Sequence, residues 1–312
     1  MRVFFSSSQL LPFRRKGAAI TMGNYDGIHV GHRHILNRLK AEAKKRRLPS
    51  VVYTFEPHPV KLLSPDNAPP LINTLSQKIE LFKSTGVDAV VIEPFTRDFS
   101  HLTPIDFFQK VVVGRLNAKF IAVGYDFTFG AKRHGNRETL EALCPQANIN
   151  LEIVEPFFKG ETLVSSSLVR KRVLEGRVAE VIPMLTRPFF MEGKIVRGEG
   201  RGARLGIPTA NLAPENELIP TEGVYVTEIH LKGKKYGGAT NIGFNPTFGN
   251  AKRTVETFIF GLKKNIYGQK ARLFFLKRLR GEIKFASKEA LVKQIRKDMG
   301  KARASLRGSP KG

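Results

Sequence analysis

Cysteine is nearly absent from this chain: among 312 residues there is one cysteine, Cys144, and no tryptophan. A single cysteine forms no disulfide within the chain and cannot supply a cysteine-based zinc site. This usage is typical of a reducing compartment. The sequence also lacks any apolar run long enough to span a membrane, and we expect no signal peptide in Met1–Gly17. These absences exclude a disulfide-stabilised secreted domain and predict a cytoplasmic protein without membrane segments.

Acidic residues are also scarce. The chain has 52 Lys and Arg against 27 Asp and Glu, a formal net charge of +25. Such a field attracts polyanions, whether nucleic acid, an anionic membrane surface or nucleotide substrates. No nucleic-acid-binding signature is present, so we expect no specific nucleic-acid partner, and a regulatory role on nucleic acid is the less favoured alternative. No feature of the sequence indicates an oligomeric state.

The residue pattern changes once along the chain. Up to about residue 185, short apolar runs alternate with amphipathic stretches, the pattern of βα units. It predicts an α/β domain, Rossmann-like, with a parallel sheet over residues 1–186. After Thr186, Arg187 and Pro188, short strands follow one another through tight turns. This second pattern predicts a mainly antiparallel β-barrel with a terminal helix over residues 187–312, ending in a basic tail.

The expected elements can be given by residue range. In the first half the expected strands are Ala18–Met22, Val51–Phe55, Val87–Glu93, Phe120–Gly124 and Asn150–Val154. The expected helices there are His32–Arg47, Thr74–Lys83, Pro104–Leu116, Asn136–Leu143 and Ser166–Leu174. In the second half we expect strands at Gly193–Glu199, Gly223–Leu231, Tyr236–Gly243, Thr254–Gly261 and Lys270–Leu279. We expect a hairpin turn at Gly233, a helix from Ser287 through Met299, and a frayed tail from Lys301.

A glycine- and histidine-rich segment, Gly-Asn-Tyr-Asp-Gly-Ile-His-Val-Gly-His at residues 23–32, joins the first strand to the first helix. Its glycines, Gly23 and Gly31 among them, let the backbone approach a ligand closely. His29 and His32 stand where the helix dipole and free N–H groups favour an anion. The pattern therefore predicts a nucleotide phosphate site. A turn capped by two histidines is the alternative.

Further motifs follow in the first half of the chain, and together they resemble those of one enzyme family. His-x-Gly-His is the signature of the nucleotidyltransferase superfamily, and Phe-Glu-Pro-His-Pro at residues 55–59 follows the second strand. Gly-Tyr-Asp-Phe-Thr-Phe-Gly at 124–130 and Ser-Ser-Ser-Leu-Val-Arg at 165–170 come later. Together they resemble the FMN adenylyltransferase half of prokaryotic bifunctional riboflavin kinase/FAD synthetases.

That resemblance implies roles for individual residues. It makes His29 and His32 the catalytic pair on the ATP phosphates. The other residues that it places on ATP are Gly23, Asn24, Gly31, Asp126, Ser165, Ser166 and Arg170. It places His58 and Phe127 on the flavin side, although His58, between two prolines, also suits a rigid turn. The chain has Tyr25 where the family usually has Phe, and Ser167 where it usually has Thr.

The second half contains a glycine-rich basic loop followed by Pro-Thr-Ala-Asn at residues 208–211. Gly198 and Gly202 free the backbone for a phosphate nest, and Arg204 adds charge. Thr209 and Asn211 face the same side of an extended segment, and their oxygens suit Mg²⁺ bound with ATP. In the apolar run 254–260 the single acid, Glu256, is a candidate general base for a primary alcohol.

These elements resemble riboflavin kinase, which implies that Thr209 and Asn211 hold Mg²⁺ and phosphate while Glu256 deprotonates riboflavin. The whole chain thus resembles a bifunctional enzyme with riboflavin, FMN and ATP as substrates. The family usually has Arg at Ala203, and His and Asp at Phe258 and Gly261. These three departures leave one alternative open, an FMN adenylyltransferase with an impaired kinase domain.

Overall fold

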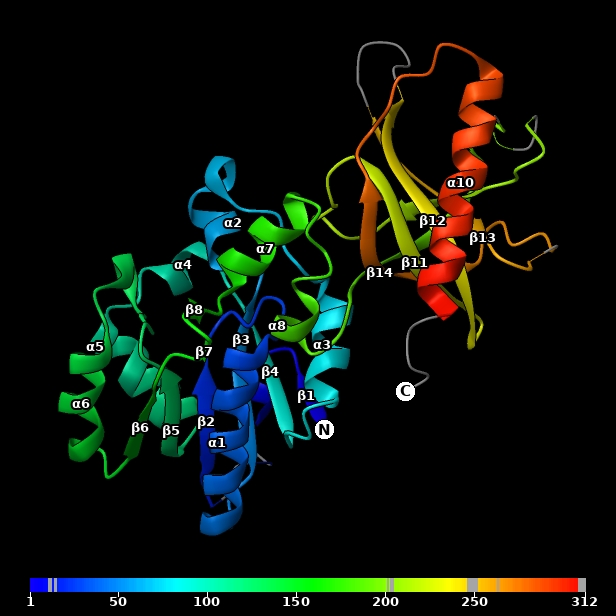
Figure 1. Cartoon of the computed structure of the whole chain (residues 1–312). Helices are drawn as coiled ribbons and strands as arrows, with labels where there is room; N and C mark the ends of the chain where they lie inside the picture. Colours follow the sequence, from blue (N-terminus) through cyan, green and yellow to red (C-terminus); the bar gives the residue numbers. More distant parts are fainter. Residues whose placement is uncertain are drawn as a thin grey trace. The chain divides into compact units, whose positions relative to one another are not determined.

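The protein is described by a computed structural model, which covers the chain except residues 11, 12, 14, 15, 201, 203, 204, 246–251, 263 and 308–312. It forms two compact units, Met1–Ser165 and Ser166–Gly312 (Figure 1). Helices α7 (Ser166–Leu174) and α8 (Ile182–Leu185) belong to the second unit by this division. The domain boundary after residue 186 stays a prediction. No helix in the described ranges is long and apolar enough to cross a membrane.

The first unit is built on a six-stranded sheet with the order β1-β4-β3-β2-β5-β6. Every neighbouring pair is parallel. The strands are β1 (Arg2–Phe4), β2 (Ala18–Met22), β3 (Ser50–Glu56), β4 (Ala89–Pro94), β5 (Ala118–Gly124) and β6 (Asn150–Val154). The predicted parallel sheet is confirmed. The edge strand β1 was not predicted, because three residues are too few to show a period.

Helices cover both faces of this sheet because its strands are apolar on both sides. Val52 and Val90 pack against α1 (Val30–Arg46) and α3 (Leu75–Lys83). Their neighbours Val51 and Val91 pack on the opposite face, with η3 (Phe107–Arg115) and α6 (Arg137–Gln146). The alternation of side chains along each strand therefore makes two cores.

Shorter elements complete the first unit. They are η1 (Ser7–Leu10), α2 (Pro59–Leu63), η2 (Pro65–Asn67), α4 (Arg97–Ser100), α5 (Pro104–Asp106), η4 (Ala131–Arg133), β7 (Phe158–Lys159) and β8 (Thr162–Leu163). The helix predicted over Pro104–Leu116 is α-helical only in α5 and continues as the π-helix η3. The Leu116 N–H donates to the Val111 carbonyl at 2.8 Å, five residues back. Apolar spacing alone does not distinguish these two helix types.

The second unit contains a closed antiparallel barrel with the strand order β10-β13-β12-β11-β14-β9. Its strands are β9 (Phe189–Val196), β10 (Ala210–Pro214), β11 (Gly223–Leu231), β12 (Lys234–Asn245), β13 (Lys252–Ile259) and β14 (Lys270–Arg280). Strand β9 pairs with both β10 and β14 and so closes the barrel. Gly233, with φ of 77°, makes the expected turn between β11 and β12. The predicted barrel is confirmed.

The direction of the side chains on β13 positions the second site. Thr257 is buried, and Thr240 links its hydroxyl to that of Thr227 through two hydrogen bonds of 2.8 Å. Since successive side chains of a strand point to opposite faces, Thr254 and Glu256 lie on the outer face. The Glu256 side chain therefore lies outside the barrel, at its surface.

The terminal helix α10 spans Lys288–Arg307, so the expectation of a frayed tail from Lys301 is wrong for residues 301–307. Ala302 is fully buried, and Leu306 packs with Met299 against Val226 of the barrel. These residues continue the helical apolar spacing beyond the predicted end. Burial of this stripe, which outweighs the high content of Lys and Arg, keeps the last turns helical.

The contact between α10 and the barrel can be tested by introducing a charge. Ala302→Asp should lower the free energy of unfolding by about 3 kcal/mol, because the carboxylate enters an apolar contact without a partner. Ala304→Asp, on the exposed side of the same helix, should change it by less than about 0.5 kcal/mol. Urea unfolding followed by circular dichroism measures both, and equal losses would contradict the assignment.

Candidate functional sites

The first candidate site lies at the carboxyl ends of three neighbouring strands. Strand β2 lies between β3 and β5, and the chain proceeds from β2 in one direction through β3 and β4 before crossing to β5. In such sheets the crevice at this reversal is where ligands bind. The Gly23–His29 loop follows β2, His58 follows β3, and Asp126 follows β5. The fold thus brings three of the predicted motifs to one edge.

The loop after β2 is held in an unusual backbone conformation from two sides. Tyr25 and Ile28 have φ of 51° and 42°, values that non-glycine residues rarely adopt. The Tyr25 hydroxyl shares a 2.5 Å hydrogen bond with Thr21, and burial raises the pKa of Tyr25. The Asp26 carboxylate accepts from the Ile72 N–H at 3.0 Å and from the Asn73 N–H at 3.3 Å. Packing and hydrogen bonds therefore fix the loop, which reduces the reorganisation needed to bind a ligand.

His29 and His32 stack on each other at the start of α1. Their ring centroids are 3.7 Å apart with an interplanar angle of 20°. His29 is the N-cap, and its Nδ1 accepts from the His32 N–H at 3.4 Å. A Cβ at Gly31 would lie 3.1 Å from His29 Cε1, so a glycine there leaves room for the ring. The structure brings together the two histidines that the sequence singled out.

The electrostatic environment keeps His32 neutral. Burial lowers the pKa of the His32 imidazole well below its usual value, and the nearby charges of His29 and Lys78 lower it further. Lys78 of α3 is itself buried, and burial lowers the pKa of its ammonium group. His32 Nδ1 is buried and has no hydrogen-bond partner within the described ranges. A neutral imidazole with an unused nitrogen is suited to hydrogen-bond a ligand.

Other predicted residues surround this pair less closely. Asn24 is exposed, and its carbonyl accepts from the Thr54 hydroxyl at 3.3 Å. Gly23 donates its N–H to the Tyr53 carbonyl at 3.1 Å. Asp126 is exposed next to Gly124, while Phe127 stacks on Phe129 at 5.7 Å.

The remaining predicted residues of the first site are Ser165, Ser166, Arg170 and His58. The Val164 carbonyl lies close to Gly31 in the first turn of α1, so the next residue, Ser165, is near the start of that helix. Ser166 and Arg170 lie on α7, which opens the second compact unit; their phosphate contacts stay predictions. His58 caps α2, with Nδ1 accepting from the Val60 N–H at 3.3 Å.

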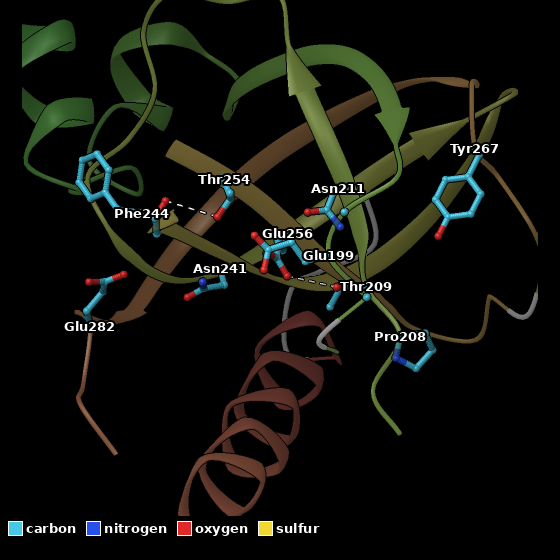
Figure 2. Close-up of a pocket in the computed structure, with 13 residues that line it drawn as sticks. Glu199, Pro208, Thr209, Asn211, Asn241, Phe244, Thr254, Glu256, Tyr267 and Glu282 are labelled. Carbon is cyan, nitrogen blue, oxygen red and sulfur yellow. Dashed lines mark hydrogen bonds between the residues drawn. The ribbon is translucent and has the colours of Figure 1, made fainter. Parts of the chain in front are cut away.

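The second candidate site is a pocket on the outer face of the barrel (Figure 2). The residues that line it include Gly198, Glu199, Pro208, Thr209, Asn211, Asn241, Gly243, Phe244, Thr254, Glu256, Tyr267 and Glu282. The pocket thus combines hydroxyl, amide and carboxylate oxygens with two aromatic rings. Its lining includes four of the predicted kinase residues, namely Gly198, Thr209, Asn211 and Glu256.

Glu256 is central to this pocket. The Thr209 hydroxyl donates to Glu256 Oε2 at 3.3 Å. Asn211 of β10 and Asn241 of β12 each lie directly across from Glu256 in strand register. The carboxylate is therefore flanked on both neighbouring strands by side chains that can donate or accept hydrogen bonds.

The glycine-rich loop lies against the same residues. A Cβ at Gly198 would collide with the Asn211 amide, and one at Gly202 with the Ile207 carbonyl. Glycine is therefore required at both positions for the loop to approach Asn211 and Thr209. Arg204 and Ala203 lie outside the described residues.

Two of the departures from the family pattern, Phe258 and Gly261, lie at or just after the end of β13. Phe258 lies on the same face of β13 as Glu256 and packs on Phe260, with ring centroids 5.8 Å apart. Phe260 belongs to the apolar cluster under α10. Gly261 follows with φ of 74°. Phe258 thus packs on a member of the cluster that contacts α10, and Thr209 supplies the hydrogen bond to Glu256.

Among the pocket residues that were not predicted as site residues are three with a carboxylate or amide side chain, Glu199, Asn241 and Glu282. Asn241 enters through the register of β12 with β13, which a single sequence does not specify. Glu282 follows the end of β14 and reaches the pocket near Gly243. Only the three-dimensional arrangement places these residues together.

Comparison with known proteins matches both halves of the chain. A family model described as FAD synthetase matches residues 12–168, and one described as riboflavin kinase matches residues 185–306. A bifunctional riboflavin kinase/FMN adenylyltransferase from Buchnera aphidicola subsp. Schizaphis graminum is 35% identical, covering 90% of this chain and 92% of that protein. The Escherichia coli K12 protein of the same description is 34% identical, with 91% of each chain covered.

A solved structure shows the same fold over nearly the full length. It is described as a macrolide-efflux protein from Streptococcus pneumoniae, with a TM-score of 0.87, 30% identity, and coverage of 97% of this chain and 99% of that one. The description belongs to that protein. Its likeness supports the architecture of both units here.

The lowered pKa of His32 predicts a pH-dependent contribution to stability. As the pH falls through about 6.5, the unfolded chain takes up a proton on His32 that the folded chain does not. The free energy of unfolding should therefore decrease toward acid pH. The His32→Gln variant has no titratable side chain at position 32. It should therefore lose less stability than the wild type between about pH 7 and pH 5. Urea titrations at the two pH values measure this, and an equal or larger loss in the variant would contradict it.

Proposed function

Because the chain belongs to the bifunctional riboflavin kinase/FMN adenylyltransferase family, we propose that it phosphorylates riboflavin to FMN with ATP and then adenylylates FMN to FAD. The expectation of two flavin-coenzyme activities in one chain is confirmed at the level of the family. The observation that carries the proposal is that each half of the chain has its own candidate site. One has stacked histidines at a helix start, and the other has a Thr–Glu pair on a barrel.

For adenylylation, an FMN phosphate oxygen attacks the α-phosphorus of ATP and pyrophosphate leaves. Charge increases on the phosphoryl oxygens during this step, and fixed donors lower its energy. His29 and His32 are such donors at the positive end of α1, which is 17 residues long. The neutral state of His32 is compatible with hydrogen bonding rather than proton exchange. The histidines need form no covalent intermediate.

The other residues of the first site receive supporting roles in this proposal. Gly23 and Gly31 let the backbone approach the ATP phosphates, and Asn24 lies next to the phosphates. Asp126 and Phe127 line the cleft between nucleotide and flavin. Further phosphate contacts come from Ser165, Ser166 and Arg170, and His58 borders the flavin.

For riboflavin phosphorylation, Glu256 accepts the proton of the ribityl 5′-hydroxyl while that oxygen attacks the γ-phosphorus of ATP. ADP leaves with the bridging oxygen. The 3.3 Å hydrogen bond from Thr209 orients the carboxylate. Asn211 and the backbone of the glycine-rich loop, with Gly198, Gly202 and Arg204, contact the phosphates. This arrangement keeps base and phosphate donors within one pocket.

The donor set at this site fits Mg²⁺. Thr209 and Asn211 offer hard oxygen atoms, and they stand beside the Glu256 carboxylate. The described part of the chain contains no cluster of three His, Cys, Asp or Glu side chains able to hold a metal by themselves. The oxygen donors of Thr209 and Asn211 suit a cation that keeps several waters and binds mainly through ATP phosphates. When bound, Mg²⁺ would neutralise charge on those phosphates.

The alternative, an adenylyltransferase with an impaired kinase domain, was motivated by Ala203, Phe258 and Gly261. Thr209 orients Glu256 in the absence of the family's usual His and Asp, which favours a working kinase site. A measurement of products separates the two possibilities. We expect riboflavin, ATP and Mg²⁺ to give FMN and then FAD, resolved by chromatography. FAD formation from FMN but not from riboflavin would support the alternative, and neither product would contradict both.

Two substitutions should separate the activities. His29→Ala should reduce FAD formation from FMN by about 10²–10³-fold, because one phosphate donor is lost. It should leave FMN formation from riboflavin unchanged. Glu256→Gln should reduce FMN formation by about 10²–10⁴-fold through loss of the base, while FAD formation from supplied FMN continues. Loss of both activities in either folded variant would argue against two independent sites.

A further inference from the structure

A second carboxylate, Glu282, lies in the kinase pocket on the segment that follows β14. We infer that Glu282 is a specificity-determining residue that accepts a hydrogen bond from a donor group of the neutral, hydroxyl-bearing flavin substrate. This inference rests on the proposed riboflavin kinase activity and names the side of the pocket on which the flavin binds.

The position of Glu282 within the pocket is the first argument. Figure 2 shows Glu282, Asn241 and Phe244 on one side of Glu256, and Pro208 and Tyr267 on the other. The glycine-rich loop packs on Thr209 and Asn211, which places the phosphate-binding groups away from Glu282. Glu256, the proposed base, therefore separates a phosphate side from a second side that contains Glu282.

The charge of Glu282 decides what can bind on that second side. A carboxylate accepts hydrogen bonds only, so it favours hydroxyl or N–H donors and repels phosphate oxygens. Riboflavin is uncharged and has ribityl hydroxyls and a ring N–H, whereas the triphosphate of ATP is strongly anionic. Phe244 also lines the pocket and is 47% exposed. Arg253 lies over its ring, 5.5 Å from the centroid, and the exposed part of the ring offers a surface on which an aromatic ring can pack. The side with Glu282 therefore matches the flavin.

The segment that carries Glu282 is held by the terminal helix. Arg280 donates from Nε and Nη2 to Asp298 Oδ2 of α10 at 2.9 and 2.8 Å. Gln294 donates to the other oxygen of the same carboxylate at 2.9 Å. Arg280 also donates from Nη1 to the Gly281 carbonyl at 2.8 Å and lies over the Phe285 ring. The buried Asp298 thus holds Arg280 at the start of the segment around Glu282, and Arg280 contacts Phe285 at its end.

The facing strand leaves space for the carboxylate. A Cβ at Gly243 of β12 would lie 2.8 Å from Glu282 Oε1. The Glu282 head group therefore occupies the place that a side chain at position 243 would take. Gly243 is the residue that lets the carboxylate lie over the strand beside Asn241. An alanine there must displace it without removing the charge.

Steady-state kinetics of FMN formation test the inference with Glu282→Gln. We expect the KM for riboflavin to rise about tenfold, since a charged acceptor is replaced by a neutral one. The KM for ATP and kcat should stay within about twofold of the wild type. Glu217→Gln, an exposed carboxylate outside the pocket lining, is the matched charge control and should leave all three constants unchanged.

Gly243→Ala is the second variant, because it retains Glu282 and moves it. It should raise the KM for riboflavin in the same direction, and a KM for ATP within about twofold of the wild type in the same assay reports that the barrel is folded. A rise in the KM for ATP with an unchanged KM for riboflavin would place Glu282 on the nucleotide and overturn the inference. Unchanged constants in Glu282→Gln would also overturn it. If the wild type makes no FMN, the proposed kinase activity itself fails, which is a separate result.

Discussion

Close approach of a functional side chain to a bare backbone is the constraint on which both sites depend. At the start of α1, the His29 ring lies against Gly31, and in the barrel the Asn211 amide lies against Gly198. In each case a methyl group would displace the side chain that is proposed to bind the ligand. Loops of this kind cannot gain stability from side-chain packing, so the surrounding structure must hold them. Asp26, through the N–H groups of Ile72 and Asn73, does this in the first unit.

The sequence predicted the architecture because its periods are clear. Alternating apolar runs predicted five of the six sheet strands, and the turn predicted at Gly233 lies between β11 and β12. The glycine and histidine motifs placed His29 and His32 correctly at one helix start. The end of α10 was missed because a basic composition outweighed the spacing of Ala302 and Leu306. Element boundaries depend on such tertiary contacts, which local composition does not contain.

Contacts that depend on strand register were beyond prediction. Asn241 and Asn211 meet Glu256 only because β12 and β10 pair with β13 in one particular register. The hydrogen bond from Thr209 to Glu256 is equally invisible in the sequence, where 46 residues lie between them. This hydrogen bond also bears on Phe258, which stands where the family usually has His. The loss of an orienting histidine is compatible with catalysis when a threonine hydroxyl orients the base, and the aromatic side chain packs on Phe260.

The link between Arg280 and Asp298 ties the last helix to a substrate pocket. Any equilibrium that frees α10 from the barrel also frees the segment carrying Glu282, so helix docking and ligand affinity are thermodynamically coupled. Because such coupling is reciprocal, a ligand held by that segment must in turn slow the opening of the helix. Amide hydrogens of α10 far from the pocket would then exchange more slowly with solvent when the pocket is filled. The carboxyl-terminal helix is thus a reporter of occupancy as well as a cover for the barrel.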